Sequence, residues 1–175
     1  MKVNFTGKPV ELAGNELKVG DKAPVITLAG NDLSDVVVGG AKDHVQIIST
    51  VPSLDTEVCA MQTRKMNQSI ANAVGLKMTI VSMDLPFASG RFCSANGIAN
   101  VTTASDFRAK ALGEAYGVLI AEGPLSGLLA RAVFVIGTDG TLLYKQIVPE
   151  ITDEPDYTAI QNAIGTIPGV ACGAH

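Results

Sequence analysis

The stretch Val51-Pro-Ser-Leu-Asp-Thr-Glu-Val-Cys-Ala-Met-Gln-Thr-Arg64 stands between two different chain patterns. Before it, residues 44–50 (His-Val-Gln-Ile-Ile-Ser-Thr) are rich in β-branched and apolar side chains, which predicts a buried strand. After its first half, residues 60–74 contain good helix formers and neither Gly nor Pro, which predicts a helix. The stretch is therefore the passage from a strand into a helix.

Cys59 is expected in the first turn of this helix. Asp55 or Thr56 is a suitable N-cap, because a short side chain with an oxygen can accept a hydrogen bond from a free amide. If Thr56 is the cap, its hydroxyl points at the amide of Cys59. Free N–H groups and the positive end of the helix dipole favour an anion here, so the position favours the nucleophilic thiolate. The alternative is an inert core cysteine, since free cysteines are usually buried.

The rest of the chain predicts an α/β fold. The next strand is expected at residues 76–83, with Gly75 ending the helix before it, which gives a βαβ unit with parallel strands. A hairpin is expected at residues 3–12, and a turn at 138–141 joins another. Further strands are expected at residues 25–28, 36–38, 101–104, 128–136 and 142–148, and further helices at 88–96, 107–116 and 156–164. We therefore expect a mixed central β-sheet flanked by helices.

Several motifs carry a resemblance to a known family. Pro52-x-x-x-Thr56-x-x-Cys59 is the pattern of the peroxiredoxins, and the run from Ser53 to Ala60 resembles their thiol peroxidase subfamily, the atypical two-cysteine enzymes. Further matches follow at Asp84-Leu-Pro-Phe-Ala, Arg91-Phe-Cys93, Ala115-Tyr-Gly-Val, Gly123-Pro-Leu, Ala130-Arg-Ala132 and Glu154-Pro-Asp-Tyr157. The resemblance covers the chain to about residue 164, and it implies a thioredoxin-like fold with an added N-terminal β-hairpin.

Cys93 is far outside C-x-x-C spacing from Cys59, so a thioredoxin-type motif is absent. The residues alone leave two interpretations. Cys93 is either an incidental, partly buried cysteine or a thiol on a flexible element, since Ser, Gly and Asn surround it. The resemblance implies the second, with Cys93 as the resolving thiol that forms an intramolecular disulfide with Cys59.

Arg131 stands inside the apolar run 128–136. A buried guanidinium needs an anion or several acceptors beside it, because an unpaired buried charge is costly. The alternative is an arginine near the start of the strand that reaches water. The resemblance implies that Arg131 stabilises the Cys59 thiolate and polarises a peroxide.

The bulk properties exclude several classes of protein. The chain has 175 residues, of which 47 % are hydrophobic and 17 % charged, so a disordered chain is excluded. We expect one domain at residues 1–165 and a mobile tail at residues 166–175, which holds Cys172. A net charge of −4 without a basic run argues against nucleic acid as a partner. No apolar stretch reaches the roughly 20 residues of a membrane span, and residues 1–9 lack a signal-peptide core, so we expect a cytoplasmic protein and no membrane partner.

The residues and the resemblance together predict a thiol-dependent peroxidase for hydrogen peroxide and organic hydroperoxides. Cys59 is the nucleophile, Thr56 and Arg131 hold the O–O bond, and Pro52 stiffens and shields the loop before the helix. The resemblance implies thioredoxin as the reductant and a homodimer. It implies no organic cofactor, and no close-spaced pair of ligands suggests a metal. The alternative function is a non-enzymatic redox sensor or binding module of thioredoxin fold that uses the same disulfide.

Overall fold

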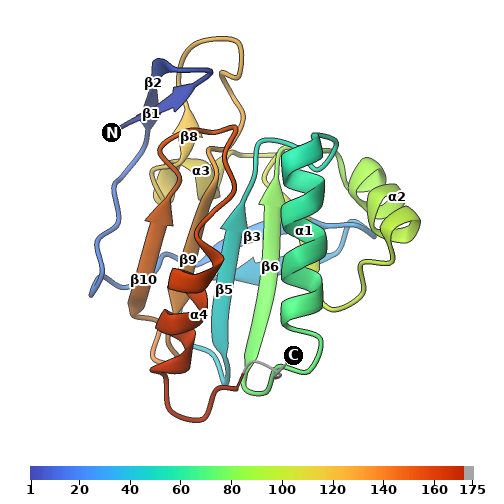
Figure 1. Cartoon of the computed structure of the whole chain (residues 1–175), viewed down its shortest axis with the longest axis vertical. Helices are drawn as coiled ribbons and strands as arrows, with labels where there is room; N and C mark the ends of the chain where they lie inside the picture. Colours follow the sequence, from blue (N-terminus) through green and yellow to red (C-terminus); the bar gives the residue numbers. More distant parts are fainter. Residues whose placement is uncertain (172–175) are drawn as a thin grey trace.

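The strand–helix–strand unit around Cys59 lies at the centre of the computed structural model, which describes residues 1–171 (Figure 1). It consists of β5 (Val45–Thr50), α1 (Glu57–Ser69) and β6 (Leu76–Ser82). β5 and β6 are parallel, as predicted, and their register runs from Val45 opposite Leu76 to Thr50 opposite Val81. Every residue of β5 is buried. Burial on both faces is typical of a central strand in a sheet with layers on either side.

The central sheet of the described residues has seven strands in the order β10-β9-β5-β6-β7-β3-β4. Only the neighbours β5–β6 and β6–β7 within this sheet are parallel, so the sheet is mixed, as predicted. The strands not yet given are β3 (Ile26–Gly30), β4 (Asp35–Val38), β7 (Thr102–Ser105), β9 (Ala132–Ile136) and β10 (Leu142–Ile147).

A small second sheet contains the predicted N-terminal hairpin. β1 (Lys2–Phe5) and β2 (Lys8–Ala13) are antiparallel, and the turn between them brings Phe5 opposite Lys8. β2 also pairs with β8 (Leu119–Ile120), a short strand that the sequence pattern did not predict. The N-terminal hairpin is therefore joined to the body of the protein through β8, which is more than a hundred residues later in the sequence.

The helices cover the sheet unequally. α1 and α4 (Tyr157–Gly165) lie on one face of the central sheet, and α3 (Ala111–Ala115) lies on the other, together with the second sheet (Figure 1). Alternate residues of β9 divide between the two cores: Phe134 belongs to the core with α3, whereas Val133 and Val135 belong to the core with α1 and α4. α2 (Pro86–Asn96) lies beside α1, near β7.

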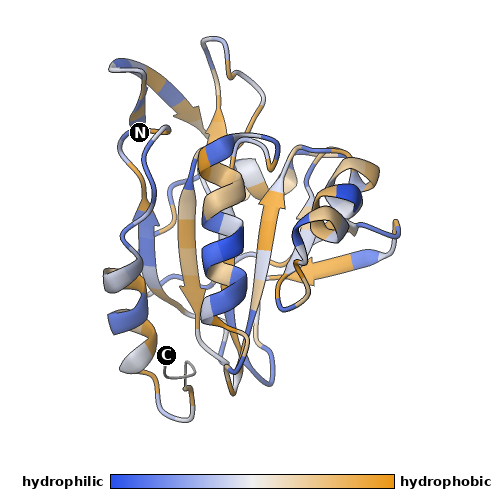
Figure 2. Ribbon diagram, turned by 45° about the vertical axis from the view of Figure 1, so that its right-hand side comes forward, coloured by the Kyte–Doolittle hydropathy of each residue, from blue (hydrophilic) through white to orange (hydrophobic). Residues whose placement is uncertain are grey.

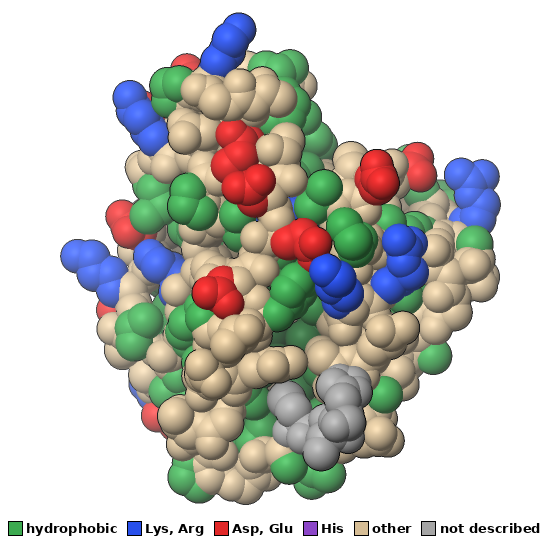
Figure 3. Space-filling model, viewed as in Figure 1, with side chains coloured by type: hydrophobic (Ala, Val, Ile, Leu, Met, Phe, Trp, Pro, Cys, Tyr) green, Lys and Arg blue, Asp and Glu red, His purple; other side chains and the backbone are tan. Residues whose placement is uncertain are grey.

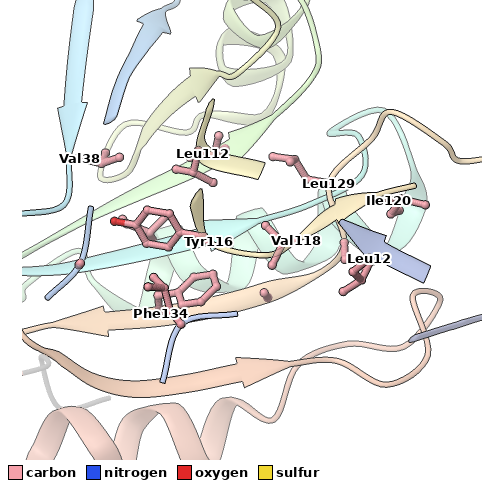
Figure 4. Close-up of a cluster of buried hydrophobic side chains, with 14 of the residues drawn as sticks. Leu12, Val38, Leu112, Tyr116, Val118, Ile120, Leu129 and Phe134 are labelled. Carbon is pink, nitrogen blue, oxygen red and sulfur yellow. The ribbon is translucent and has the colours of Figure 1, made fainter. Parts of the chain in front are cut away.

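The core behind the sheet is organised by two aromatic rings (Figure 4). Tyr116 and Phe134 meet edge to face, with ring centroids 5.2 Å apart. The Tyr116 hydroxyl donates a hydrogen bond to the Pro24 carbonyl at 2.8 Å, and burial raises the pKa of this phenol. The aromatic pair therefore joins α3, β9 and the segment before β3 without leaving the phenol unpaired.

The outer surface of α1 is polar, while the strands behind it are largely apolar (Figure 2). Between α1 and α4 runs a hollow of about 330 Å³ with an apolar floor that includes Met66, Ile70 and Ile160 (Figure 3). Among the helices of residues 1–171, none is both long and apolar enough to cross a membrane.

Several predicted boundaries are wrong. α1 ends at Ser69, well before Gly75, because the chain turns at Ile70–Ala73 and Gly75 (φ +75°) serves the turn into β6. α3 begins at Ala111, and not at residue 107, because Lys110 adopts a left-handed conformation (φ 53°). β9 likewise begins at Ala132 instead of residue 128.

The packed part of the chain extends past the predicted domain end at residue 165. Val74 and Ala171 exchange two backbone hydrogen bonds, of 2.9 and 3.2 Å. Ile167 and Val170 pack against the core on the α1 side of the sheet. The first part of the expected tail is thus held on the fold, and Cys172 lies outside the described residues.

Gly39 provides a test of the packing behind the sheet. It has φ +79°, and a Cβ there would lie 1.9 Å from the Pro24 carbonyl oxygen and 2.7 Å from the Tyr116 hydroxyl. Gly7 has nearly the same φ, +77°, with no heavy atom of the described chain within 4 Å of such a Cβ. We expect Gly39→Ala to lower the free energy of unfolding by more than about 3 kcal/mol, against about 1 kcal/mol for Gly7→Ala. Urea denaturation measures both, and equal losses would contradict the close approach.

Candidate active site

Cys59 is the third residue of α1. Thr56 has extended backbone angles (φ −99°, ψ 147°) and is the N-cap, so the helix begins at Glu57. The Cys59 side chain is only 1 % exposed. This is the predicted position, in the first turn of the helix where unpaired amide groups favour an anion.

The Thr56 side chain is oriented differently from the prediction. Its hydroxyl donates to the Ser53 carbonyl at 3.1 Å, and within residues 1–171 it makes no hydrogen bond to an amide of α1. The expectation that it points at the amide of Cys59 is therefore wrong. A threonine hydroxyl can bond to a nearby carbonyl of its own turn, and this local bond wins here.

Arg131 lies immediately before β9 and is 2 % exposed. Its Nη2 donates to Cys59 Sγ at 3.3 Å. Nε and Nη2 also donate to the Ile151 carbonyl, at 3.1 and 3.0 Å, and Nη1 donates to Gln62 Oε1. The interpretation of an arginine that reaches water is therefore wrong. This guanidinium is buried with acceptors and a sulfur around it, as a buried charge requires.

Gln62 is a site residue that the sequence reasoning missed. Its side chain is fully buried, and it accepts from Arg131 while its own Nε2 donates to Ser49 Oγ at 2.9 Å. It thereby joins α1 to β5 and fixes the direction of the guanidinium. The sequence did contain a signal for this role. Gln62 is three residues after Cys59, so it lies on the same face of the helix, and a polar side chain there could reach the same partners.

Asp84 holds the loop that leads into α1. Its carboxylate accepts hydrogen bonds from the Leu54 amide (2.7 Å), the Ser53 hydroxyl (2.7 Å) and the Ser82 hydroxyl (2.8 Å). Asp84 lies two residues after the last residue of β6, so the parallel neighbour of β5 fixes the loop after β5. Hydrogen bonds to a charged acceptor are stronger than neutral ones, which makes this an effective anchor.

A cavity of about 250 Å³ opens in front of this group. Pro52 and Thr56 line it beside Arg131, and the other walls are mostly apolar, with Phe5 from the N-terminal hairpin and Leu128 among them. Pro52 is buried, consistent with a shielding position. The structure thus places Pro52, Thr56 and Arg131 around a small, largely apolar space, and Cys59 lies behind it, in contact with Arg131.

Cys93 is not part of this group. It lies in the second half of α2, half-buried, and its sulfur contacts Thr103 Oγ1 at 3.3 Å and Asn31 Nδ2 at 3.9 Å. Both Cys59 and Cys93 are free thiols in this structure. The two sulfurs therefore have different partners, on different elements.

A second set of charges lies next to the arginine. Lys65 Nζ pairs with Glu154 at 2.7 Å, and the Tyr157 hydroxyl donates to the same carboxylate at 2.6 Å. The hydrogen bond from Lys65, followed by that from Tyr157, lowers the pKa of Glu154. This cluster links α1 to α4. Among residues 1–171, no group of three or more His, Cys, Asp or Glu side chains is placed to hold a metal ion.

The anchoring role of Asp84 can be measured directly. We expect Asp84→Asn to raise amide hydrogen exchange of residues 53–58 about five- to tenfold, because a neutral side chain accepts more weakly from the Leu54 amide. Asp55→Asn is the matched control, since Asp55 is an exposed carboxylate of the same loop. Equal exchange in the two variants would show that Asp84 does not hold the loop.

Comparison with known proteins agrees with this geometry. Residues 18–160 match the redoxin family model. The chain is 56 % identical over 162 residues to a thiol peroxidase of Aquifex aeolicus, which covers 93 % of this chain and 95 % of that one. It is 52 % identical over 174 residues to a thiol peroxidase of Campylobacter jejuni, covering 99 % and 98 % of the two chains.

A solved structure gives the same result for the fold. The crystal structure of a peroxiredoxin-like protein from Aquifex aeolicus is 56 % identical and superimposes with a TM-score of 0.90, over 92 % of this chain and 94 % of that one. The predicted thioredoxin-like fold and the predicted family are thereby confirmed. The chain belongs to the redoxin family, as a member of the thiol peroxidase group of the peroxiredoxins.

Proposed function

We propose that this chain reduces hydroperoxides with Cys59 as the nucleophile. The observation that supports this most is the contact of Arg131 Nη2 with Cys59 Sγ, 3.3 Å long, at the N-terminus of α1. A cation and a helix N-terminus both stabilise a thiolate, which is the reactive form of a cysteine. The relatives at 56 % and 52 % identity are named thiol peroxidases.

The reaction follows from the side chains around the sulfur. The Cys59 thiolate attacks one peroxide oxygen, the O–O bond breaks, and the products are a Cys59 sulfenic acid and, after protonation of the leaving oxygen, water or an alcohol. Arg131 can donate to the oxygen on which charge develops, and such donors act most strongly where water is excluded. The Thr56 hydroxyl already donates to Ser53, so its lone pairs remain to accept the peroxide O–H.

The cavity in front of Arg131 supports organic hydroperoxides as well as hydrogen peroxide. Its apolar walls, which include Phe5, Leu125 and Leu128, suit the carbon chain of an organic hydroperoxide. Pro52 closes one side of the cavity and restricts water near the sulfur.

Cys93 is the resolving thiol in this proposal. It condenses with the Cys59 sulfenic acid to an intramolecular disulfide, and thioredoxin, a dithiol reductant, restores both thiols by exchange. Because Cys59 lies in a formed helical turn, and Cys93 lies in α2 with partners on other elements, the disulfide requires one or both segments to unwind first. We further propose a homodimer in the cytoplasm, without an organic cofactor or a metal.

The alternative of a non-enzymatic redox sensor is not favoured. A sensor requires a reactive thiol, but it has no need of a threonine and an arginine arranged around a cavity beside that thiol. The names of the relatives point to the peroxidase in the same way.

Removal of the Cys59 sulfur tests the proposed function. We expect Cys59→Ser to abolish thioredoxin-dependent peroxide reduction while circular dichroism and urea midpoints stay near those of the wild type. Cys172→Ser is the control, because it removes a thiol outside the resemblance and should keep full turnover. Turnover by Cys59→Ser would refute the mechanism, and loss of recycling in Cys172→Ser would make Cys172 the resolving thiol.

The role of Arg131 is tested by a change that preserves its charge. We expect Arg131→Lys to slow Cys59 oxidation about 10- to 100-fold in stopped-flow measurements, because an ammonium cannot contact the sulfur, Gln62 and the Ile151 carbonyl with one planar group. Arg64→Lys on the exposed face of α1 is the matched control and should oxidise at the wild-type rate. A wild-type rate for Arg131→Lys would make Arg131 a structural residue only.

A further inference from the structure

The side chains of Asn31 and Thr103 form a closed ring of hydrogen bonds with the sulfur of Cys93. Asn31 Nδ2 donates to Cys93 Sγ at 3.9 Å, Cys93 Sγ lies 3.3 Å from Thr103 Oγ1, and Thr103 Oγ1 donates to Asn31 Oδ1 at 3.0 Å. Asn31 follows β3, Thr103 lies in β7, and Cys93 lies in α2. The ring therefore ties α2 to two strands of the central sheet.

The ring closes only if Cys93 carries its proton. The Thr103 hydroxyl has one hydrogen, which it donates to Asn31, so the bond between Thr103 and Cys93 must use the S–H of the cysteine. Rotating the Asn31 amide by 180° reverses the direction of the ring but still uses the S–H as one donor. A thiolate or a disulfide sulfur has no S–H, so either leaves the ring open.

The other attachments of α2 are weak. Within α2, which the structure describes in full, the only buried side chains are those of Pro86 and Ser89. Within residues 1–171, the buried Ser89 hydroxyl has no hydrogen-bond partner. Gly90 lies in the middle of the helix, where glycine lowers helix stability, and Phe87 is 69 % exposed. Besides the ring, α2 is held mainly by the partly buried side chain of Phe92, which packs against the core on the α1 side, and by a 3.1 Å bond from Arg64 to Asn96.

We propose that Asn31 and Thr103 act as a latch that holds the reduced, protonated Cys93 in folded α2 and sets how fast the disulfide forms. They are positioning residues, because they act on the reaction through Cys93 alone. The latch must open before Cys93 can reach Cys59, and it cannot close again until the reductant has restored the S–H. This inference rests on the proposed function for its kinetic consequence but not for the latch itself.

The latch determines the fate of the Cys59 sulfenic acid. In one reaction, Cys59–SOH and Cys93–SH give the disulfide, and the sulfenic hydroxyl leaves with the thiol proton as water. In the other, a second hydroperoxide transfers an oxygen to the sulfenic acid, which becomes a sulfinic acid while the hydroperoxide becomes an alcohol or water. A slower opening of α2 gives the second reaction more time. A latch that stabilises the reduced fold of α2 therefore also makes Cys59 more sensitive to excess peroxide.

Single-turnover kinetics test the proposal. In stopped-flow mixing with hydrogen peroxide, we expect Thr103→Val to leave the first phase, oxidation of Cys59, unchanged. The second phase, disulfide formation, should become about three- to tenfold faster, which corresponds to the loss of one hydrogen bond. The yield of sulfinic acid at high peroxide, measured by mass spectrometry, should fall by a similar factor.

Three further variants separate a latch from a general structural effect. Thr103→Ser keeps the hydroxyl and should restore the wild-type second phase. Thr102→Val changes the exposed neighbour on the same strand and should have no effect. Asn31→Ala removes the other partner of Cys93. It keeps the Asn31 Cβ, which faces Gly90 of α2 and lies 3.7 Å from the position of a Cβ built on that glycine. It therefore provides a second test if Thr103→Val folds poorly. An unchanged or slower second phase in both latch variants would overturn the proposal.

Hydrogen exchange tests the latch independently of peroxidase activity. In the reduced protein, we expect the amides of α2 to exchange about three- to tenfold faster in Thr103→Val than in the wild type. In the disulfide form, which has no S–H to close the ring, the two proteins should exchange alike. If the chain proved to have no peroxidase activity, the first difference would remain. If the reduced proteins exchanged alike, the latch would be refuted whatever the activity.

Discussion

The contact between the Arg131 guanidinium and the Cys59 sulfur is the interaction on which the rest of the site depends. A buried cation is tolerated only where acceptors surround it, and here they are Gln62 and the Cys59 sulfur, both in α1, and the Ile151 carbonyl after β10, while Arg131 itself lies before β9. Three separate segments must therefore be in place before the thiol has its partner. The central strands β5 and β9 provide this, because they are neighbours in the sheet and carry α1 and Arg131 at their adjacent ends.

Much of the fold could be predicted because its signals are local. The β-branched run at residues 44–50 was enough to predict β5. The absence of Gly and Pro from residues 60–74 was enough to predict the helix that begins as α1. The errors lie where tertiary contacts decide. α1 stops at Ser69 although good helix formers continue, and β8 has only two residues, too few for any periodic pattern. The antiparallel pairing of β3 with β7 depends on residues far apart in sequence.

The candidate site divides in the same way. Cys59 at a helix start and Arg131 in an apolar run are unusual within their own segments, so both could be recognised from the sequence. Gln62 looks like any helical glutamine until the structure shows it fully buried. The Ile151 contact uses a backbone carbonyl, which every residue has, and no side-chain pattern predicts it. Asp84, Asn31 and Thr103 act through partners on other elements and carry no local signal of that role.

The order of these segments along the chain has a consequence for synthesis on the ribosome. Cys59 precedes Arg131 by 72 residues, and the carbonyl that fixes the guanidinium comes 20 residues later still. At about 5–20 residues per second, the thiol waits roughly 4–14 s for its arginine to be made. During that time it is an ordinary cysteine, without the cation that makes it reactive. While the chain is being synthesised, Cys59 therefore lacks its contact with Arg131. The thiol gains that contact only when the last strands of the sheet, β9 and β10, have been added.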